Sequence, residues 1–345
     1  MFGQKTQRIN PSCFGKYRTI RRRIWRNIHS PIDQVTFDFC SSQSIKSKRF
    51  LSPRSEHSEP HLHGMTDRLY DLAALDMDGT LLNSAHEITP FTRDALNRAD
   101  AAGKVISLCT GRCLSELRDH LARVPGIRYA INESGGCLYD VRADRVLRQA
   151  AIDDDVAEWL FDIAAPRDVL LQGFFGNQSY MQIEDVKRIA RYHMAGFEPV
   201  FEAGTRFTPD LRALWHHSGR PMTKFLLYFT DEAEKARFTE DMGEVDLCVT
   251  GCLGIGYEIS PKGAGKDDGL RALCDHLGLS IERTMAVRDG NNDIELMRAA
   301  GFSVAMGSAV APVRQLADAV TDDCDHDGAG KAVLRYMLGE TIEEM

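Results

Sequence analysis

The stretch LAALDMDGTLLNS, from Leu72 to Ser84, joins an apolar run to two closely spaced acids. Together with the residues just before it, the run LYDLAALD has the near-continuous hydrophobicity of a strand buried on both faces of a parallel sheet. It ends in Asp76 and Asp78, with only Met77 between them, and a Gly-Thr pair follows. Two like charges at the end of a buried strand are costly unless a cation or a shared proton accompanies them.

The same rhythm of apolar strands and amphipathic helices continues on both sides of a long central segment. Further strands are predicted at 104–110, 129–136, 284–288 and 302–306. Helices are predicted at 90–103, 114–124, 266–278, 293–301, 311–318 and 330–338. Alternating strands and helices, with strands that are apolar throughout, predict an α/β fold with a doubly wound parallel sheet.

The central segment has a different pattern, which predicts an inserted α+β domain. A hairpin is expected at 136–150, helices at 153–165, 184–196 and 231–243, and strands at 169–182, 223–230, 246–251 and 256–261. The chain therefore divides into a basic, disordered extension at 1–64, a core domain formed by 65–149 and 259–345, and an inserted cap domain at 150–258.

Composition narrows the class of protein. The chain has 345 residues, of which 43% are hydrophobic and 27% charged, as in globular proteins. It contains no apolar run of about 18 residues, which argues against a membrane protein. Its nine cysteines include no CxxC pair, which favours a reduced, cytoplasmic protein. We expect a monomer or a weak homo-oligomer.

Charge is unevenly distributed along the chain. Residues 1–65 carry a net charge of +8, whereas the whole chain carries −8, so the remainder carries −16. An acidic body argues against nucleic acid as a partner. The basic segment itself has three open interpretations: an extension upstream of a natural start at Met65, which we favour, an organelle transit peptide, or a nucleic-acid contact.

Polar residues end the predicted parallel strands. Thr110 and Gly111 follow the second strand, and Asp289 follows the strand at 284–288. Ligands bind beyond the carboxyl ends of strands in open α/β sheets, so we expect these groups to meet Asp76 and Asp78 there. Hard carboxylate oxygens with open positions suit Mg²⁺ that also binds a phosphate, and backbone amides at helix starts receive phosphate oxygens.

Four motifs in order carry a family resemblance: DMDGT, SLCTGR, a lysine within SPKGAGKDDGL, and RDGNND. With them, the chain from Leu69 to about Leu338 resembles the haloacid dehalogenase superfamily, and within it the Cof-like phosphatases. The resemblance implies a Mg²⁺-dependent phosphatase that acts on a small phosphorylated metabolite, with a large cap inserted between the second and third motifs.

The resemblance also implies a role for each matching residue. Asp76 would be the nucleophile that forms an aspartyl-phosphate, and Asp78 the general acid and base. The phosphate ligands would be Met77, Thr110, Gly111, Lys266 and Asn292. The Mg²⁺ site would use Asp76, Asp78, Asp289 and Asp293, with Asp78 contributing its backbone. Side chains two apart on an extended chain face the same way, which would bring Asp76 and Asp78 together.

Several alternatives remain open at this point. Lys262 competes with Lys266 for the third motif, although Lys266 fits the family position better. Arg288 and Asp267 stand where the family usually has glycine, which keeps a non-catalytic phosphometabolite-binding protein as an alternative; a phosphosugar mutase is another. Arg288 would either bind phosphate as a clamp or crowd the metal loop, and we favour crowding because a family glycine marks close backbone approach.

Overall fold

The structure of the chain is a computed structural model that describes residues 69–252, 254–290 and 294–341. Residues 1–68, on which the predicted basic extension falls, lie outside the described part, as do Asn292 and Asp293. No helix in the described ranges is long and apolar enough to cross a bilayer.

The first sheet has eight strands in the order β14-β13-β12-β1-β2-β3-β4-β5. Its strands are β1 (Leu72–Leu75), β2 (Val105–Cys109), β3 (Ile127–Asn132), β4 (Cys137–Asp140), β5 (Arg145–Gln149), β12 (Thr284–Arg288), β13 (Phe302–Ala305) and β14 (Ala319–Val320). Neighbours from β14 to β3 pair in parallel, and the pairs β3–β4 and β4–β5 are antiparallel. This confirms the predicted doubly wound α/β fold.

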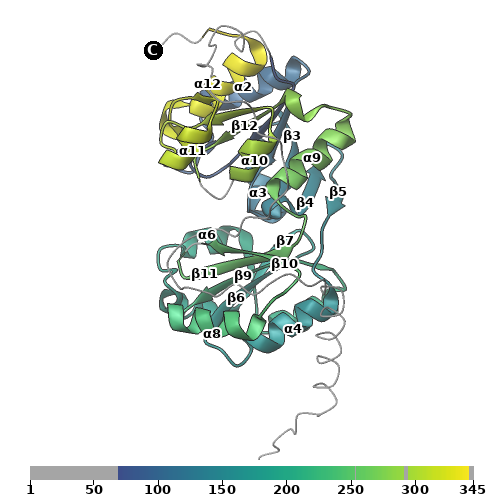
Figure 1. The fold of residues 1–345 in the computed structure, drawn as a ribbon, viewed down its shortest axis with the longest axis vertical. Coiled ribbons are helices and arrows are strands. Elements are labelled where there is room, and N and C mark those ends of the chain that lie inside the picture. The colour runs from purple at the N-terminus through teal and green to yellow at the C-terminus, as the bar shows by residue number, and fades with distance from the viewer. Residues whose placement is uncertain (1–68, 253, 291–293, 342–345) are drawn as a thin grey trace, which may run out of the picture. The chain divides into compact units, whose positions relative to one another are not determined.

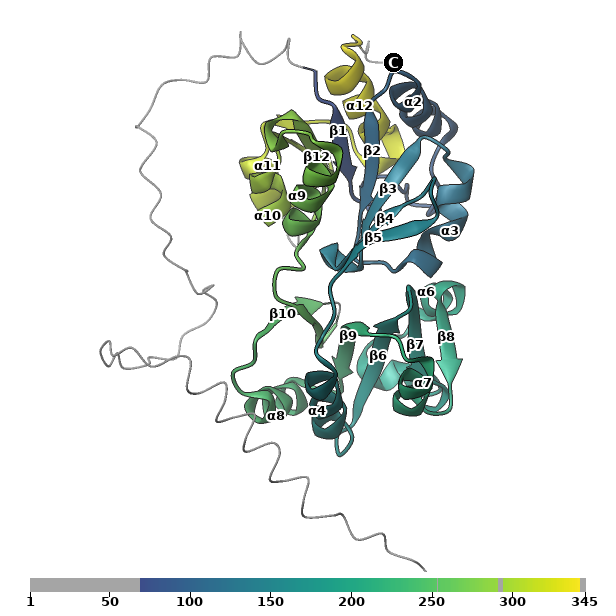
Figure 2. The same ribbon diagram turned by 90° about the vertical axis from the view of Figure 1, so that its right-hand side faces the viewer.

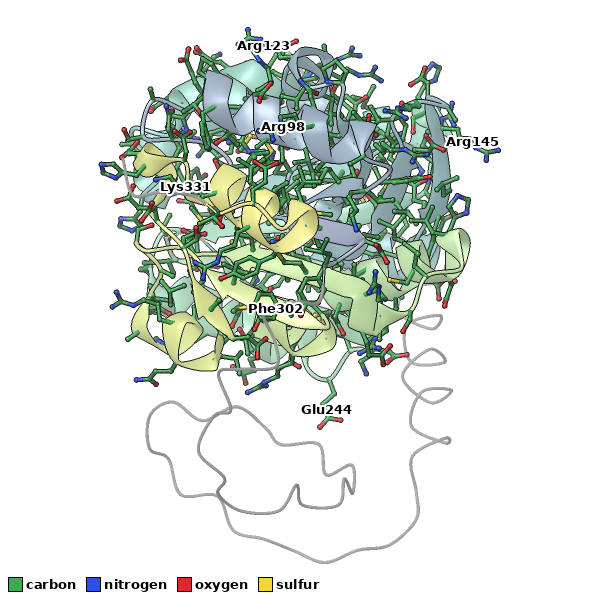
Figure 3. The ribbon with its side chains drawn as sticks, turned by 90° about the horizontal axis from the view of Figure 1, so that it is seen from above. Arg98, Arg123, Arg145, Glu244, Phe302 and Lys331 are labelled. Carbon is green, nitrogen blue, oxygen red and sulfur yellow. The ribbon has the colours of Figure 1, made fainter. Side chains whose placement is uncertain are left out.

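Helices cover both faces of this sheet (Figure 2). The helices α2 (Pro90–Ala101), α3 (Leu114–Arg123) and α12 (Gly328–Leu338) contribute to the apolar cluster on one face. The helix α9 (Lys266–Leu277) and α10 (Ile294–Ala299) pack on the other. Helix α11 spans Ala311–Leu316. Arg98 and Lys331, labelled in Figure 3, mark the adjacent helices α2 and α12.

Local sequence explains where α2 begins and ends. The hydroxyl oxygen of Thr89 accepts a hydrogen bond from the Thr92 amide, and Pro90 occupies the first turn, where its missing N–H costs nothing. Gly103 follows the helix with φ of +80°, a conformation that favours glycine. The turn therefore delivers the chain directly into β2.

The second sheet has six strands in the order β10-β11-β9-β6-β7-β8. They are β6 (Val169–Phe175), β7 (Gln178–Gln182), β8 (Thr205–Thr208), β9 (Met222–Phe229), β10 (Leu247–Cys252) and β11 (Gly256–Pro261). Helices α4 (Asp154–Ala164), α7 (Leu211–Ser218) and α8 (Glu232–Met242) cover one face, and α6 (Glu198–Gly204) lies at the other. Figure 1 shows α4 and α8 on the side of the sheet opposite to α6. The expected domain boundary at residue 258 falls inside β11.

The helix predicted at 184–196 is wrong. The chain instead forms the short α5 (Ile183–Val186) and a 3-10 turn, η2 (Ile189–Tyr192), separated by Arg188 in a non-helical conformation. His193 then adopts φ of +60°, which ends the turn. Tyr192 is buried and donates a hydrogen bond to Asp168, so tertiary contacts hold this segment in place of a continuous helix.

Candidate active site

Asp76 lies directly beyond β1, between β2 on one side and β12 on the other. The chain runs from β1 to β2 first and reaches β12 only much later, so the two neighbours leave in opposite directions from β1. This is the switch point at which open α/β sheets bind ligands. The Asp76 amide donates to the carbonyl of Val287 (3.2 Å), which fixes the carboxylate at the shared edge of β1 and β12.

Two basic side chains flank the buried Asp76 carboxylate. Lys266 Nζ lies 3.6 Å from Oδ1, and Arg288 Nη1 lies 3.4 Å from Oδ2. Burial alone disfavours the charged carboxylate, but Lys266 and Arg288 outweigh it, so the pKa of Asp76 is lowered. Burial, followed by the Arg288 charge, lowers the pKa of Lys266. The site thus keeps an ionised carboxylate away from bulk water.

The loop after Asp76 turns sharply. The carbonyl of Met77 accepts hydrogen bonds from the amides of Thr80, Leu81 and Leu82, and the Met77 side chain is buried in the core. Because β1 ends at Leu75, strand alternation does not extend to Asp78. The Asp78 side chain is 56% exposed, in contrast to that of Asp76, at 12%.

Asp78 forms a two-pronged ion pair with Arg112. Arg112 Nε donates to Oδ2 (3.1 Å) and Nη2 to Oδ1 (2.6 Å) of Asp78, the planar geometry in which arginine binds carboxylates best. Arg112 follows Thr110 and Gly111 in the second motif, yet we predicted no role for it. Its position within the second motif was the sequence feature that could have indicated a role for Arg112 in the site.

Asp289 reaches the same loop from β12. Its Oδ1 accepts a hydrogen bond from Thr80 Oγ1 (3.2 Å), and a Cβ on Gly79 would lie 2.2 Å from its Oδ2. Gly79, whose φ is +72°, therefore leaves the space that the Asp289 carboxylate occupies. Burial and the neighbouring Asp76 charge raise the pKa of Asp289, the effect expected of two carboxylates that share a site.

These residues fit a divalent cation. Two converging carboxylates, one with its pKa raised by the other, are what a hard cation neutralises, and Gly79 leaves room for their approach. No cluster of three or more His, Cys, Asp or Glu side chains occurs among the described residues, so Asp76 and Asp289 would supply only part of the shell. Asp293, the other predicted ligand, and Asn292 lie outside the described residues.

The predicted phosphate loop follows β2. Thr110 is buried, and its hydroxyl oxygen accepts a hydrogen bond from the Arg112 amide (3.2 Å), which closes a tight turn at Gly111. The carbonyl of Gly111 accepts a hydrogen bond from Lys224 Nζ (2.7 Å), a residue of β9 in the second sheet. Lys224 is almost fully buried and also pairs with Glu258 of β11 (3.3 Å).

The two candidate lysines of the third motif differ in position. Lys266, the first residue of α9, lies beside Asp76, as predicted for the motif lysine. Lys262 is 63% exposed and pairs with Asp246 (2.5 Å), away from the acidic pair. Asp267, where the family usually has glycine, lies in the first turn of α9, where an acid is favourable to the helix dipole.

A loop with an unusual backbone conformation follows β3 and contacts the second motif. Glu133 and Ser134, directly after β3, adopt φ of +53° and +60°, which non-glycine residues rarely do. The Ser134 amide donates to the Thr110 carbonyl (3.0 Å), so the loop supports the phosphate loop. Burial raises the pKa of Glu133, which lies near Lys224 and Thr223. We did not predict Glu133, Lys224 or Glu258 as site residues. The one sequence feature that could have indicated them is Lys224, a lysine inside an apolar strand.

Comparison with known proteins identifies the protein family in which this site occurs. The model of the haloacid dehalogenase-like hydrolase family matches residues 73–333. Phosphatase YwpJ of Bacillus subtilis is 26% identical, over 77% of this chain and 99% of its own. The 5-amino-6-(5-phospho-D-ribitylamino)uracil phosphatase YcsE of the same organism is 25% identical, over 77% and 96%.

A solved structure is similar to this chain in both sequence and fold. BT1666 from Bacteroides thetaiotaomicron, described among phosphatases of the haloalkanoate superfamily, is 26% identical, with a TM-score of 0.66. The match covers 81% of this chain and 99% of that one, so nearly all of that fold has a counterpart here.

Proposed function

Because the chain belongs to the haloacid dehalogenase-like hydrolases, in their Cof-like branch, and is a phosphoric monoester hydrolase, we propose that it is a Mg²⁺-dependent phosphatase of a small phosphorylated metabolite. One observation carries the proposal: a buried, ionised carboxylate, Asp76, stands at the switch point beside Lys266 and faces a converging second carboxylate, Asp289. A relative named for a phosphorylated ribityl compound supports the substrate class.

In the proposed reaction, an oxygen of Asp76 attacks phosphorus and the bond from phosphorus to the leaving oxygen breaks. Asp78 gives its proton to that oxygen, and the product alcohol departs. Asp78 then takes a proton from water, which attacks the aspartyl-phosphate, releases inorganic phosphate and restores Asp76. Arg112 must release Asp78 for the first proton transfer, because its guanidinium occupies both carboxylate oxygens of Asp78.

The other site residues bind and orient phosphate in this proposal. Lys266 offsets the charge of the phosphoryl group beside Asp76, while Thr110 and the amides around Gly111 receive its oxygens. Asp76 and Asp289 would hold Mg²⁺, with a backbone group of Asp78 and with Asp293. The cation would neutralise the charge that develops on the phosphoryl oxygens.

We further propose that the sheet β6–β11 and its helices form a cap domain over the core. Lys224 supports this, since it joins β9 to the phosphate loop through Gly111. A cap that contacts the phosphate loop can exclude water and contact the leaving group. The substrate would then be selected largely by residues of the second sheet.

The test is a hydrolysis assay with an aryl phosphate and a panel of phosphorylated metabolites, with Mg²⁺ or with a chelator. We expect Mg²⁺-dependent release of phosphate by the full chain. Asp76→Asn should reduce turnover to background while its thermal melt stays near that of the unsubstituted chain. Hydrolysis that persists in Asp76→Asn would refute the nucleophile. Melting shifts with phosphorylated ligands, but no hydrolysis of any, would favour the binding-protein alternative.

A further inference from the structure

Arg288 lies next to Asp76 because of the strand register. Val287 of β12 pairs with Leu75 of β1, so the next residues, Arg288 and Asp76, stand side by side at the strand ends. In addition, Arg288 Nη2 donates to the carbonyl of Cys109 at the end of β2 (3.0 Å). The guanidinium thus reaches from β12, past the end of β1, to β2.

The position of Arg288 argues against a phosphate clamp. Its side chain is 0% exposed, and its guanidinium already contacts the Asp76 carboxylate and the Cys109 carbonyl. These contacts hold the guanidinium within the sheet edge. The physical reason is the register of β12 against β1, which places Arg288 next to Asp76. Neither sequence-based expectation included this pairing with Asp76.

Both oxygens of Asp76 therefore face a cation that belongs to the protein. Lys266 approaches Oδ1 and Arg288 approaches Oδ2. A divalent cation held by Asp76 and Asp289 would bind the same Asp76 carboxylate that Arg288 contacts. The guanidinium of Arg288 would repel this cation. Lys266 corresponds to the motif lysine of the family. Arg288, in contrast, replaces the usual glycine and adds a positive charge.

We propose that Arg288 is a positioning residue that competes with the divalent cation for the Asp76 carboxylate. It holds the Asp76 carboxylate in place when metal is absent, and it weakens metal binding. The inference rests on the proposed function, since it takes Asp76 and Asp289 as metal ligands. It assigns to this chain a lower metal affinity than the same site would have with a small neutral residue at position 288.

Direct metal binding tests this competition. We would titrate the full chain with Mn²⁺ and follow free Mn²⁺ by electron paramagnetic resonance, with thermal melts in chelator as the check on folding. Arg288→Gly removes the side chain, Arg288→Gln keeps a donor for Cys109 but removes the charge, and Arg288→Lys keeps the charge. Arg298→Gln, which removes an exposed arginine paired with Glu295 on α10, is the matched control for net charge.

The Kd for Mn²⁺ should fall about tenfold or more in Arg288→Gly and Arg288→Gln, because a buried positive charge near the cation is removed. Arg288→Lys and Arg298→Gln should stay near the unsubstituted chain. Equal or weaker Mn²⁺ binding by a folded Arg288→Gln or Arg288→Gly would overturn the proposal. Hydrolysis by the unsubstituted chain is measured in parallel: tighter Mn²⁺ binding in the variants without any hydrolysis would refute the proposed function alone.

Discussion

Asp78 and Arg112 form the most exposed charge pair of the site, and their exposure has a chemical consequence. Asp76 is buried between Lys266 and Arg288, whereas Asp78 is open to water and to a substrate. The Asp78 side chain is 56% exposed and that of Arg112 23%, so the pair can open at small cost. This contrast supports the proposed division of roles, in which Asp78 transfers protons and Asp76 attacks phosphorus.

This division of roles predicts how Asp78→Asn behaves. The variant should hydrolyse an alkyl phosphate roughly 10²–10⁴-fold more slowly, because a poor alkoxide leaving group needs a proton from the general acid. An activated aryl phosphate, whose leaving group departs without a proton, should lose much less. The measurement is kcat for both substrates in Asp78→Asn and in the unsubstituted chain. Equal losses on the two substrates would remove Asp78 from the role of acid.

At the same scale, the sequence predicted which groups gather but not how they pair. The approach of Asp289 to Asp76 was expected from strand ends that share one edge of a sheet, whereas Lys266 was expected from the family resemblance. The contact of Arg288 with Asp76 depends on the register of β1 against β12, which lie more than two hundred residues apart in the chain. No local sequence pattern encodes that register, so the contact between Arg288 and Asp76 could be seen only in the structure.

Among the elements, β9 shows how one strand serves two purposes. Phe225, Leu227 and Phe229 point into the apolar core beneath α4 and α8. Lys224, on the opposite face, reaches the Gly111 carbonyl and the Glu258 carboxylate, and its Nζ lies 4.5 Å from the Phe174 ring centroid. A lysine this buried is stabilised only by such partners, so its contacts tie the second sheet to the phosphate loop.

Lys224→Met should therefore lower both stability and catalytic efficiency. The change removes the cation that pairs with the largely buried Glu258 and a charged hydrogen bond to Gly111, losses of up to about 3–5 kcal/mol and about 1.5–3 kcal/mol in comparable cases. Thermal melts and kcat/KM for an aryl phosphate would measure the two effects.

Lys235→Met is the matched control for this substitution. Lys235 of α8 also lies 4.5 Å from an aromatic ring, that of Tyr257, but is less buried and makes no described contact with the phosphate loop. Its variant should stay near the unsubstituted chain in melt and in kcat/KM. If the two variants behave alike, the contact between Lys224 and Gly111 does not support the site.

The elements themselves were predicted well where one period dominates. The parallel strands and the helices around them appear close to their expected bounds, because buried strands and amphipathic helices carry strong patterns. The segment 184–208 was missed for a physical reason. It breaks into α5, η2, α6 and β8, elements too short to show a period, and buried contacts such as that of Tyr192 with Asp168 decide their conformation.

On the scale of the whole molecule, the first described residues already belong to the folded body. Tyr70 stacks on Phe302, its amide donates to the Tyr336 carbonyl (3.0 Å), and Asp71 pairs with Lys104 and Arg283. The apolar clusters of both sheets are built from residues after Leu69 among those described. The described residues from Leu69 onward therefore already supply the cores of both sheets.

Deletion of residues 1–64 tests this view of the chain. A chain that starts at Met65 should keep the melting temperature and the phosphatase activity of the full chain, because its contacts from Tyr70 onward are unchanged. The deleted segment is basic and the body carries −16, so any attraction between them is electrostatic and screened by salt. Both chains should be melted and assayed side by side at low and at high salt. A large loss at both salt concentrations would show that the segment packs on the fold or completes the site, whereas a loss confined to low salt would reveal only charge attraction.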